Sequence, residues 1–218
     1  MSTVVLVGVT QPRLPGVESV EDLVAYAARV SNPSNQMNSE TAPKLLRYLM
    51  KNQHWSPFEM VSLTMEINTT RDIARQILRH RSFSFQEFSQ RYASAESLGF
   101  ETREARMQDS KNRQASLETT DRELQDMWQE KQLELLRKTR DVYTWALTNG
   151  IAKEQARAVL PEGNTQSRLY MAGTLRSWLH YCLLRTELGT QKEHRVVAEQ
   201  CFALIKLEFP SIAELLDS

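Results

Sequence analysis

The sequence is poor in glycine, and this excludes the common nucleotide-binding loops. It has only seven glycines in 218 residues, and no two of them are separated by a single residue. The dinucleotide fingerprint requires a Gly-x-Gly pair, and the P-loop requires two glycines five positions apart. Neither pattern can be written anywhere in this chain. Any nucleotide or nucleotide cofactor must therefore be bound without a glycine-rich turn.

Cysteine, net charge and long apolar runs are also scarce. The two cysteines, Cys182 and Cys201, fall in helical patterns without metal-ligand spacing, so we expect buried reduced thiols and no metal site. Lys plus Arg equals Asp plus Glu at 27 each, so no global field attracts nucleic acid or a membrane. No apolar run approaches the roughly 20 residues of a membrane span, and the start of the chain has no signal-peptide pattern. We expect a cytoplasmic protein that binds small anionic ligands.

The hydrophobic periodicity predicts more helix than strand. Helices are expected over residues 19–30, 41–51, 71–78, 119–149, 153–160, 174–188 and 190–209. Strands are expected over residues 4–9, 62–68 and 165–171, the first of them buried. Because the strands are few and do not alternate regularly with helices, we expect an α+β fold: one helix-rich domain, residues 1–218, with a small mixed or antiparallel sheet.

Some finer expectations concern the second half of the chain. The long helix should be capped by Thr119 or Thr120 and should turn Trp128 and Leu135 toward the core or another subunit. Leu183 should point inward from the helix that follows the third strand. The strongly charged segment 99–116 is expected to be a mobile loop or a lid.

One short stretch, residues 79–92, gathers most of the candidate functional side chains. It reads Arg-His-Arg-Ser-Phe-Ser-Phe-Gln-Glu-Phe-Ser-Gln-Arg-Tyr and follows a predicted helix. Guanidinium groups bind phosphate or carboxylate bidentately, and a carboxylate among them can orient them or accept a ligand N–H. The stretch therefore indicates a site for an anionic ligand. Alternatively, its charges are a solvated helix end and its phenylalanines are core.

The spacing of this stretch favours the functional interpretation. Arg79-His80-Arg81, seven further residues and Ser89 resemble the Arg-His-Arg-x7-Ser signature of the flavin-dependent thymidylate synthases. The resemblance continues in His54-x-Ser56-Pro57-Phe58-Glu59, Arg75-Gln76, Glu154-x-x-Arg157-x-x-Leu160-Pro161, Arg176-Ser177 and Leu184-Arg185. It differs from the family's common pattern at Gln86, Thr174, Leu175 and His180.

The resemblance implies that the protein methylates dUMP to dTMP in the fold of that family. It implies bound FAD, NADPH as reductant, methylenetetrahydrofolate as one-carbon donor, and a homotetramer whose active sites are shared between subunits. The dUMP site would include Gln76, Ile77, Leu78, Arg79, Glu87, Phe88, Ser89, Gln90, Arg91, Arg157 and Arg185. The FAD site would include His54, Ser56, Arg79, His80, Arg81, Glu87, Thr174, Leu175, Arg176 and His180.

The chemistry of the reaction is compatible with these roles. Arg91 and Arg157 offer the donors that a phosphate dianion requires. Methylation at uracil C5 places negative charge on the N3/O4 edge of the ring, and Arg185 matches the family's arginine at that edge, so it is the candidate catalytic residue. Ser89 has no visible His/Asp relay and is assigned to binding.

A rival interpretation is a non-catalytic protein that binds single-stranded nucleic acid. The arginines of the stretch would then bind the backbone, and Phe83, Phe85 and Tyr92 would stack on bases. The neutral net charge and the lack of a basic stripe argue against it.

Overall fold

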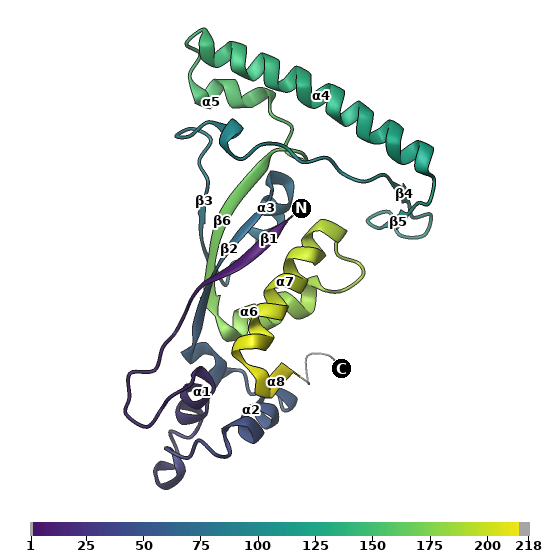
Figure 1. Cartoon of the computed structure of the whole chain (residues 1–218). Helices are drawn as coiled ribbons and strands as arrows, with labels where there is room; N and C mark the ends of the chain where they lie inside the picture. Colours follow the sequence, from purple (N-terminus) through teal and green to yellow (C-terminus); the bar gives the residue numbers. More distant parts are fainter. Residues whose placement is uncertain (1, 214–218) are drawn as a thin grey trace.

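The structure is a computed structural model that describes residues 2–213, and one antiparallel sheet forms its centre (Figure 1). The sheet contains, in spatial order, β1 (Thr3–Val9), β2 (Ser62–Thr70), β6 (Gln166–Thr174) and β3 (Ser84–Glu87). All three strand pairings are antiparallel. The expected α+β class with a small sheet is confirmed, and the sheet is antiparallel rather than mixed.

The two faces of the sheet differ in burial. One row of side chains crosses all four strands on the core side: Leu6, Met65, Met171 and Phe85. The neighbouring row lies on the opposite face: Val5, Glu66, Tyr170 and Gln86. On that face Val5 is 54% exposed, and Val7 is 55% exposed. The expected buried strand at residues 4–9 is therefore an edge strand with one open face, because an apolar run does not reveal which of its faces is covered.

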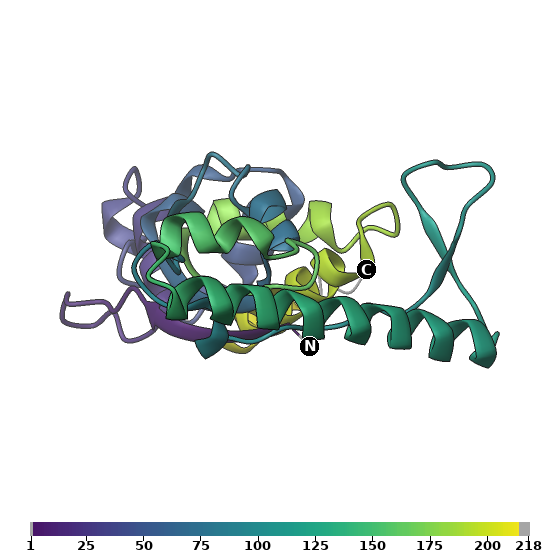
Figure 2. The same ribbon diagram turned by 90° about the horizontal axis from the view of Figure 1, so that it is seen from above.

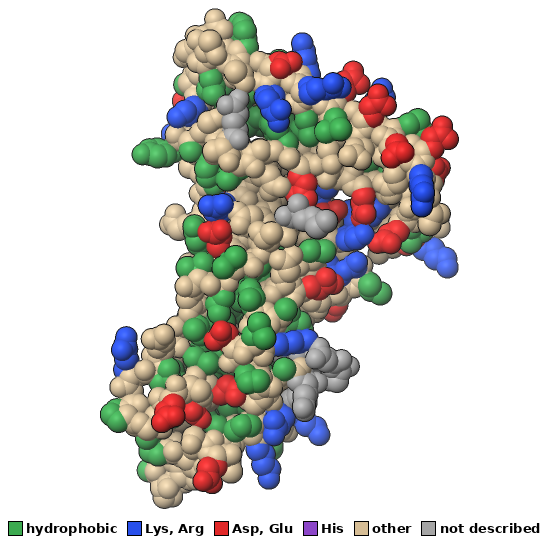
Figure 3. Space-filling view, viewed as in Figure 1, with side chains coloured by type: hydrophobic (Ala, Val, Ile, Leu, Met, Phe, Trp, Pro, Cys, Tyr) green, Lys and Arg blue, Asp and Glu red, His purple; other side chains and the backbone are tan. Residues whose placement is uncertain are grey.

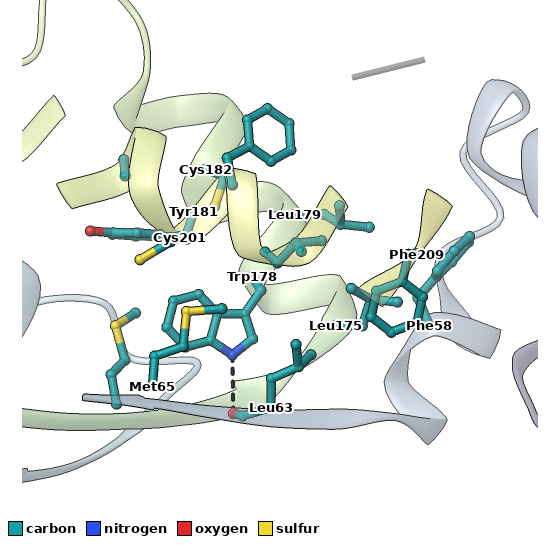
Figure 4. Packing of buried hydrophobic residues seen from close by; sticks show 14 of the residues in the cluster. Phe58, Leu63, Met65, Leu175, Trp178, Leu179, Tyr181, Cys182, Cys201 and Phe209 are labelled. Atoms are coloured by element: carbon teal, nitrogen blue, oxygen red, sulfur yellow. Dashed lines mark hydrogen bonds between the residues drawn. The ribbon is translucent and has the colours of Figure 1, made fainter. Parts of the chain in front are cut away.

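Helices α6 (Leu175–Arg185) and α7 (Lys192–Glu208) pack on the core side of the sheet (Figure 1). Trp178 is fully buried there, and its indole N–H donates to the carbonyl oxygen of Leu63 at 3.1 Å, which joins α6 to β2 (Figure 4). Cys182 and Cys201 are buried free thiols in the same core, as expected, and burial raises the pKa of both. Leu183 instead faces outward and is 41% exposed.

The N-terminal helices pack at one end of the sheet. They are α1 (Val20–Ala28), the short η1 (Pro33–Asn35), α2 (Ala42–Lys51) and η2 (Ser56–Met60), with α8 (Pro210–Ala213) beside α2. The start of α1 is a capping box, in which Ser19 Oγ accepts from the Asp22 N–H and an Asp22 carboxylate oxygen accepts from the Ser19 N–H. The predicted beginning of this helix is confirmed.

The opposite end of the sheet carries a long helix. The elements at this end are α3 (Arg71–Ile77), η3 (Ala95–Ser97), α4 (Arg122–Thr148), α5 (Lys153–Ala156) and η4 (Arg157–Val159). The long helix is α4, which lies across the end of the sheet (Figure 1). The cap of α4 is Asp121, whose Oδ1 accepts from the Leu124 N–H at 3.0 Å, and not Thr119 or Thr120. Trp128 and Leu135 are 44% and 53% exposed, so they are not core residues.

The charged segment before α4 contains a second, two-stranded sheet. It consists of β4 (Arg106–Gln108) and β5 (Ser116–Glu118), and this hairpin extends from the body beside the start of α4 (Figure 2). Acidic and basic side chains are interspersed along this part of the surface, whereas hydrophobic side chains gather over the middle of the molecule (Figure 3). None of the described helices is long and apolar enough to cross a membrane.

Candidate active site

The stretch 79–92 leaves α3, forms the edge strand β3 and then turns toward α5. Its loop is anchored by Phe83, which packs edge-on against Trp178 with ring centroids 4.9 Å apart. Phe83 also lies against Gly173, where a Cβ would be 2.4 Å from a ring carbon of Phe83. A side chain at position 173 would therefore displace the loop. The stretch contains only a short extended segment, the four-residue strand β3.

His80 and Arg185 meet although they are 105 positions apart. The Arg185 Nε–H donates to His80 Nε2 at 3.0 Å. Burial, followed by the positive charges of Arg185 and Arg79, lowers the pKa of His80 to about 4. His80 is therefore neutral near pH 7 and can accept this bond. The Nη nitrogens of Arg185 have no partner among residues 2–213, so they remain free for a ligand.

Gln76, at the end of α3, faces the start of α7. Its Oε1 lies 3.3 Å from His194 Nδ1, and its Nε2 donates to Gln191 Oε1 at 2.8 Å. His194 is fully buried, and its Nε2 lies 3.1 Å from Tyr181 Oη. His194 was not among the site residues predicted from the sequence. It lies at helical spacing from the apolar residues Val197, Ala198 and Cys201, which places it on the apolar face of the helix. A histidine on such a face was the sequence feature that could have indicated a buried role.

Glu87 and Gln90 lie at and just beyond the end of β3. Glu87 accepts from Ser167 Oγ at 2.8 Å, and Arg71 Nη1 lies 3.7 Å from the same carboxylate oxygen. Gln90 is only 4% exposed, and its Nε2 has no hydrogen-bond partner in the described chain. A buried donor without a partner costs about 1–3 kcal/mol. A bound ligand or another chain would supply the acceptor that Gln90 Nε2 lacks.

Arg91 and Arg157 converge on one residue of α5. Arg91 Nε lies 3.4 Å from a Glu154 carboxylate oxygen, and Arg157 Nε donates to the Glu154 carbonyl at 3.3 Å. Lys153 donates from Nζ to the Tyr92 carbonyl at 3.0 Å, a neighbour that the sequence analysis did not single out. A pocket of about 490 Å³ is lined by Ser89, Arg91, Tyr92, Ala152, Lys153 and Glu154. Its cationic groups suit a phosphate.

The remaining candidate residues are mostly polar and accessible. Arg79 and Arg81 are exposed and form no ion pair within the described part of the chain. Arg176 pairs with Glu59 of η2, while the ring of His180 packs edge-on against Trp55 at 4.7 Å. Burial and the charge of Arg176 lower the pKa of His180.

The side chains of several predicted ligand residues are already hydrogen-bonded or buried in the core. Thr174 caps α6 by accepting from the Ser177 N–H at 3.3 Å. Ile77 and Leu175 are fully buried in the core, so only their backbone could meet a ligand. His54 and Ser56 are exposed, at the turn into η2.

A single chain holds these residues as separate groups. Gln76, His80 and Arg185 lie between α3, α6 and α7, whereas Arg91 and Arg157 lie at α5 and His54 and Ser56 lie near η2, toward the other end of the sheet (Figure 1). Among residues 2–213, no hydrogen bond or ion pair joins one group to another.

Comparison with known proteins identifies the family. The family model described as thymidylate synthase complementing protein matches residues 16–211. A probable flavin-dependent thymidylate synthase of Paramecium bursaria Chlorella virus 1 is 51% identical over 215 residues, which is 97% of each chain. This chain belongs to the flavin-dependent thymidylate synthase family.

Further relatives of the flavin-dependent thymidylate synthase family agree in sequence and in fold. The flavin-dependent thymidylate synthase of a Synechocystis strain is 49% identical over 199 residues, covering 91% of this chain and 90% of the relative. A UMP/dUMP methylase, PolB, from Streptomyces cacaoi, solved with 5-Br UMP, superposes with a TM-score of 0.80 at 28% identity over 98% of this chain and 92% of that one. The expected family fold is confirmed.

The family assignment also decides between the two functional interpretations. A flavin-dependent thymidylate synthase is an enzyme, a methyltransferase, so the non-catalytic nucleic-acid-binding interpretation is wrong. The structure shows a physical reason. Two of the three aromatic residues expected to stack on bases, Phe83 and Phe85, pack against the hydrophobic core, and only Tyr92 of the three is exposed.

Proposed function

We propose that this enzyme converts dUMP to dTMP, with FAD as its bound cofactor, NADPH as reductant and methylenetetrahydrofolate as one-carbon donor. The observation that carries the proposal is the His80–Arg185 pair. The neutral imidazole holds Arg185 by its Nε, so the two Nη groups have a set orientation and are free to contact a substrate.

Arg185 would act on the uracil ring. Methylation requires C5 to become nucleophilic, and the electron density for this step increases at the N3/O4 edge of the ring. A guanidinium that is already oriented stabilises this charge without reorganising during the reaction. Removing one such group typically costs on the order of 10²–10³ in rate.

The phosphate of dUMP would bind at α5, beside Arg91 and Arg157. Arg91, Ser89 and Lys153 line one pocket and offer cationic and hydroxyl donors, and Arg157 is bonded to the backbone of Glu154 at its edge. Gln90 Nε2, which is buried and has no partner in the described chain, would complete its hydrogen bonding in the assembled site. We propose that the remaining dUMP residues named above keep their roles, with Ile77 contributing only its backbone.

The residues assigned to FAD fit an anionic dinucleotide. Arg79 and Arg81 are exposed cations without an ion-pair partner in the described chain, and such groups suit a diphosphate in a protein without a glycine-rich turn. Arg176, His180 and Thr174 would add contacts from α6 and its cap, and Leu175 would add only its backbone. The bound flavin would supply the redox chemistry that protein side chains lack.

We further propose a homotetramer in which neighbouring subunits complete each site. Support comes from the separation of the candidate residues into groups and from large exposed apolar side chains on α4, where Trp145 is 61% exposed and Leu133 is 45% exposed. We also propose that residues 1–218 form one domain, since the family match spans most of the chain. The two free thiols are compatible with a cytoplasmic enzyme.

Flavin binding tests this proposal. We expect purified protein to quench the fluorescence of added FAD and to retain the flavin absorption band, which should shift when dUMP is added. An Arg79→Ala, Arg81→Ala double variant should bind FAD about a hundredfold or more weakly, because each of the two lost charge-assisted hydrogen bonds is worth about 1.5–3 kcal/mol. Arg122→Ala, on the exposed first turn of α4, is the matched control and should bind normally. A wild-type protein that binds no flavin would overturn the proposal.

A further inference from the structure

A chain of hydrogen bonds runs behind the candidate site, and the proposed function does not use it. It connects five side chains in the order Tyr181, His194, Gln76, Gln191 and Glu193. The successive donor–acceptor distances are 3.1, 3.3, 2.8 and 2.9 Å. The chain begins in the core between α6 and α7 and ends at a carboxylate on the first turn of α7.

The chemistry of the five groups gives every bond the same direction. Gln76 Oε1 can only accept, so His194 Nδ1 must carry a proton and donate to it. The Nε2 of a neutral His194 then accepts from the Tyr181 hydroxyl. The amide nitrogen of Gln76 donates to Gln191 Oε1, and the amide nitrogen of Gln191 donates to a Glu193 oxygen, which accepts because Glu193 is ionised.

The protonation states that this arrangement requires are maintained at physiological pH. Burial, followed by the charge of Arg185, lowers the pKa of His194 to about 3, so the imidazole stays neutral. Burial raises the pKa of Tyr181, so its hydroxyl keeps the proton that it donates. Because the Glu193 carboxylate can only accept, the Gln191 nitrogen faces it and the Gln191 oxygen faces Gln76. Reversing the Gln76 amide would therefore place its oxygen against the Gln191 oxygen. The network therefore selects one orientation of Gln76.

Tyr181, the hydrogen-bond partner of His194, also contacts His80 of the His80–Arg185 pair. The Tyr181 ring packs edge-on against His80 with centroids 4.9 Å apart, while the His80 and His194 rings are 6.3 Å apart. His194 itself is 0% exposed, so it cannot touch a ligand. One buried side chain thus lies behind two of the groups that we assign to the substrate.

We infer that His194 is a positioning residue: its hydrogen bond holds the amide of Gln76 in place for dUMP. This inference rests on the proposed function, because it gives a role to side chains behind the proposed dUMP site. It adds a residue that does not contact the substrate and that the sequence motifs do not include.

Two variants separate the two hydrogen bonds of His194. The amide of Asn in His194→Asn can occupy the position of Nδ1 and still donate to Gln76, but it does not reach Tyr181. The longer Gln in His194→Gln places its amide near the position of Nε2, toward Tyr181, and leaves Gln76 without its partner. His194→Leu removes both bonds and keeps an apolar side chain in the core. Tyr181→Phe removes only the hydroxyl and keeps the ring against His80.

The measurement is the dissociation constant of dUMP for the FAD-loaded protein by titration calorimetry, alongside the thermal midpoint and dTMP formation. We expect His194→Leu and His194→Gln to bind dUMP about five- to tenfold more weakly, the effect of about one lost hydrogen bond. His194→Asn and Tyr181→Phe should stay within about threefold of the wild type in dUMP affinity. The control Cys201→Ala, also fully buried on α7, should lower the thermal midpoint and leave dUMP affinity unchanged.

The outcomes distinguish this inference from the proposed function. A wild-type protein that does not bind dUMP would overturn the proposed function and this inference with it. Normal wild-type binding, with the Asn and Gln variants at position 194 equal in dUMP affinity, would overturn the inference alone. If His194→Leu does not fold, the comparison of Asn with Gln still decides.

Discussion

At the scale of single residues, Arg185 shows how the fold prepares a charge before any substrate arrives. Its position on the last turn of α6 suits a cation, since the C-terminal end of a helix carries partial negative charge. The bond from its Nε to His80 then restricts how the planar guanidinium can turn. Arg157, in contrast, is held by a single bond to a backbone carbonyl. Substitution of the two arginines should therefore change the kinetics in different ways.

We expect Arg185→Ala to lower kcat for dTMP formation by on the order of 10²–10³, the usual cost of losing a group that stabilises charge in the transition state. Oxidation of NADPH should stay close to normal, because the proposed contact is with the uracil ring. Arg157→Ala should chiefly raise KM, because a phosphate contact is made equally in the ground and transition states. Steady-state assays over a range of dUMP concentrations separate the two effects.

The assignment of Arg185 is wrong if Arg185→Ala keeps a near-normal kcat and changes only KM. Arg122→Ala serves as the control for removal of an arginine at the surface, and both of its constants should match the wild type.

The sequence could predict the candidate residues that lie in a motif with defined spacing, such as Arg79, His80, Arg81 and Ser89. The contacts of His194 and Lys153 could not be predicted, because they join distant parts of the chain. The contact between His80 and Arg185 spans 105 positions, and that between Gln76 and His194 spans 118. Such pairs follow from the docking of α3, α6 and α7, which no local pattern encodes.

At the scale of elements, the base of the β4–β5 hairpin is tied to the start of α7 by ion pairs. Arg103 and Arg106 both contact Glu193, at 2.9 and 2.6 Å. Lys192 lies 2.8 Å from Glu104 and 2.6 Å from Glu118. Because Glu193 also accepts from Gln191, the hairpin and the hydrogen-bond chain to Gln76 share one carboxylate.

This carboxylate should make the hairpin sensitive to acid. Burial alone would raise the pKa of Glu193, but the hydrogen bond from Arg106 and the charge of Arg103 outweigh it and hold the pKa at about 2, below its ordinary value of 4.5. The folded pKa is lower than the unfolded one, so the ion pairs stabilise the fold fully above about pH 4.5. That stability is lost as the pH falls toward about 2.

We expect amide hydrogen exchange in residues 106–118 to accelerate below about pH 4, after correction for the intrinsic pH dependence of exchange. Glu193→Gln should show the same acceleration already at pH 7. Glu199→Gln is the matched control, since Glu199 is 54% exposed and pairs only with Arg195 on its own helix, among the described residues. Unchanged protection of the hairpin in Glu193→Gln would contradict this account of its anchoring.

Elements with local start and stop signals were predicted well. The capping box of Ser19 and Asp22 marks α1, and Pro43 in the first turn marks α2. Errors arose where tertiary packing decides. The apolar run of β1 lies at an open edge, and α4 buries Gln132 and Thr139 while Trp128 remains outside. Periodicity reports that one face of an element is covered, but neighbouring elements determine which one.

At the scale of the whole molecule, one chain carries the candidate groups at different places along the sheet. The cations proposed for the phosphate, Arg91 and Arg157, lie at α5, and the arginine proposed for the uracil ring, Arg185, lies at the end of α6. Large apolar side chains are exposed on α4 and on the outer face of β1. Both features are accounted for if chains associate and complete one another's sites.

The conversion of dUMP to dTMP is the most direct test of the account as a whole. Purified protein supplied with FAD, NADPH, methylenetetrahydrofolate and dUMP should release dTMP, identified by chromatography and mass spectrometry as dUMP with one added methyl group. Omitting any one of the four compounds should abolish the product, once copurified flavin has been removed. Failure of the complete mixture to form dTMP, from protein that binds both FAD and dUMP, would contradict the proposed function.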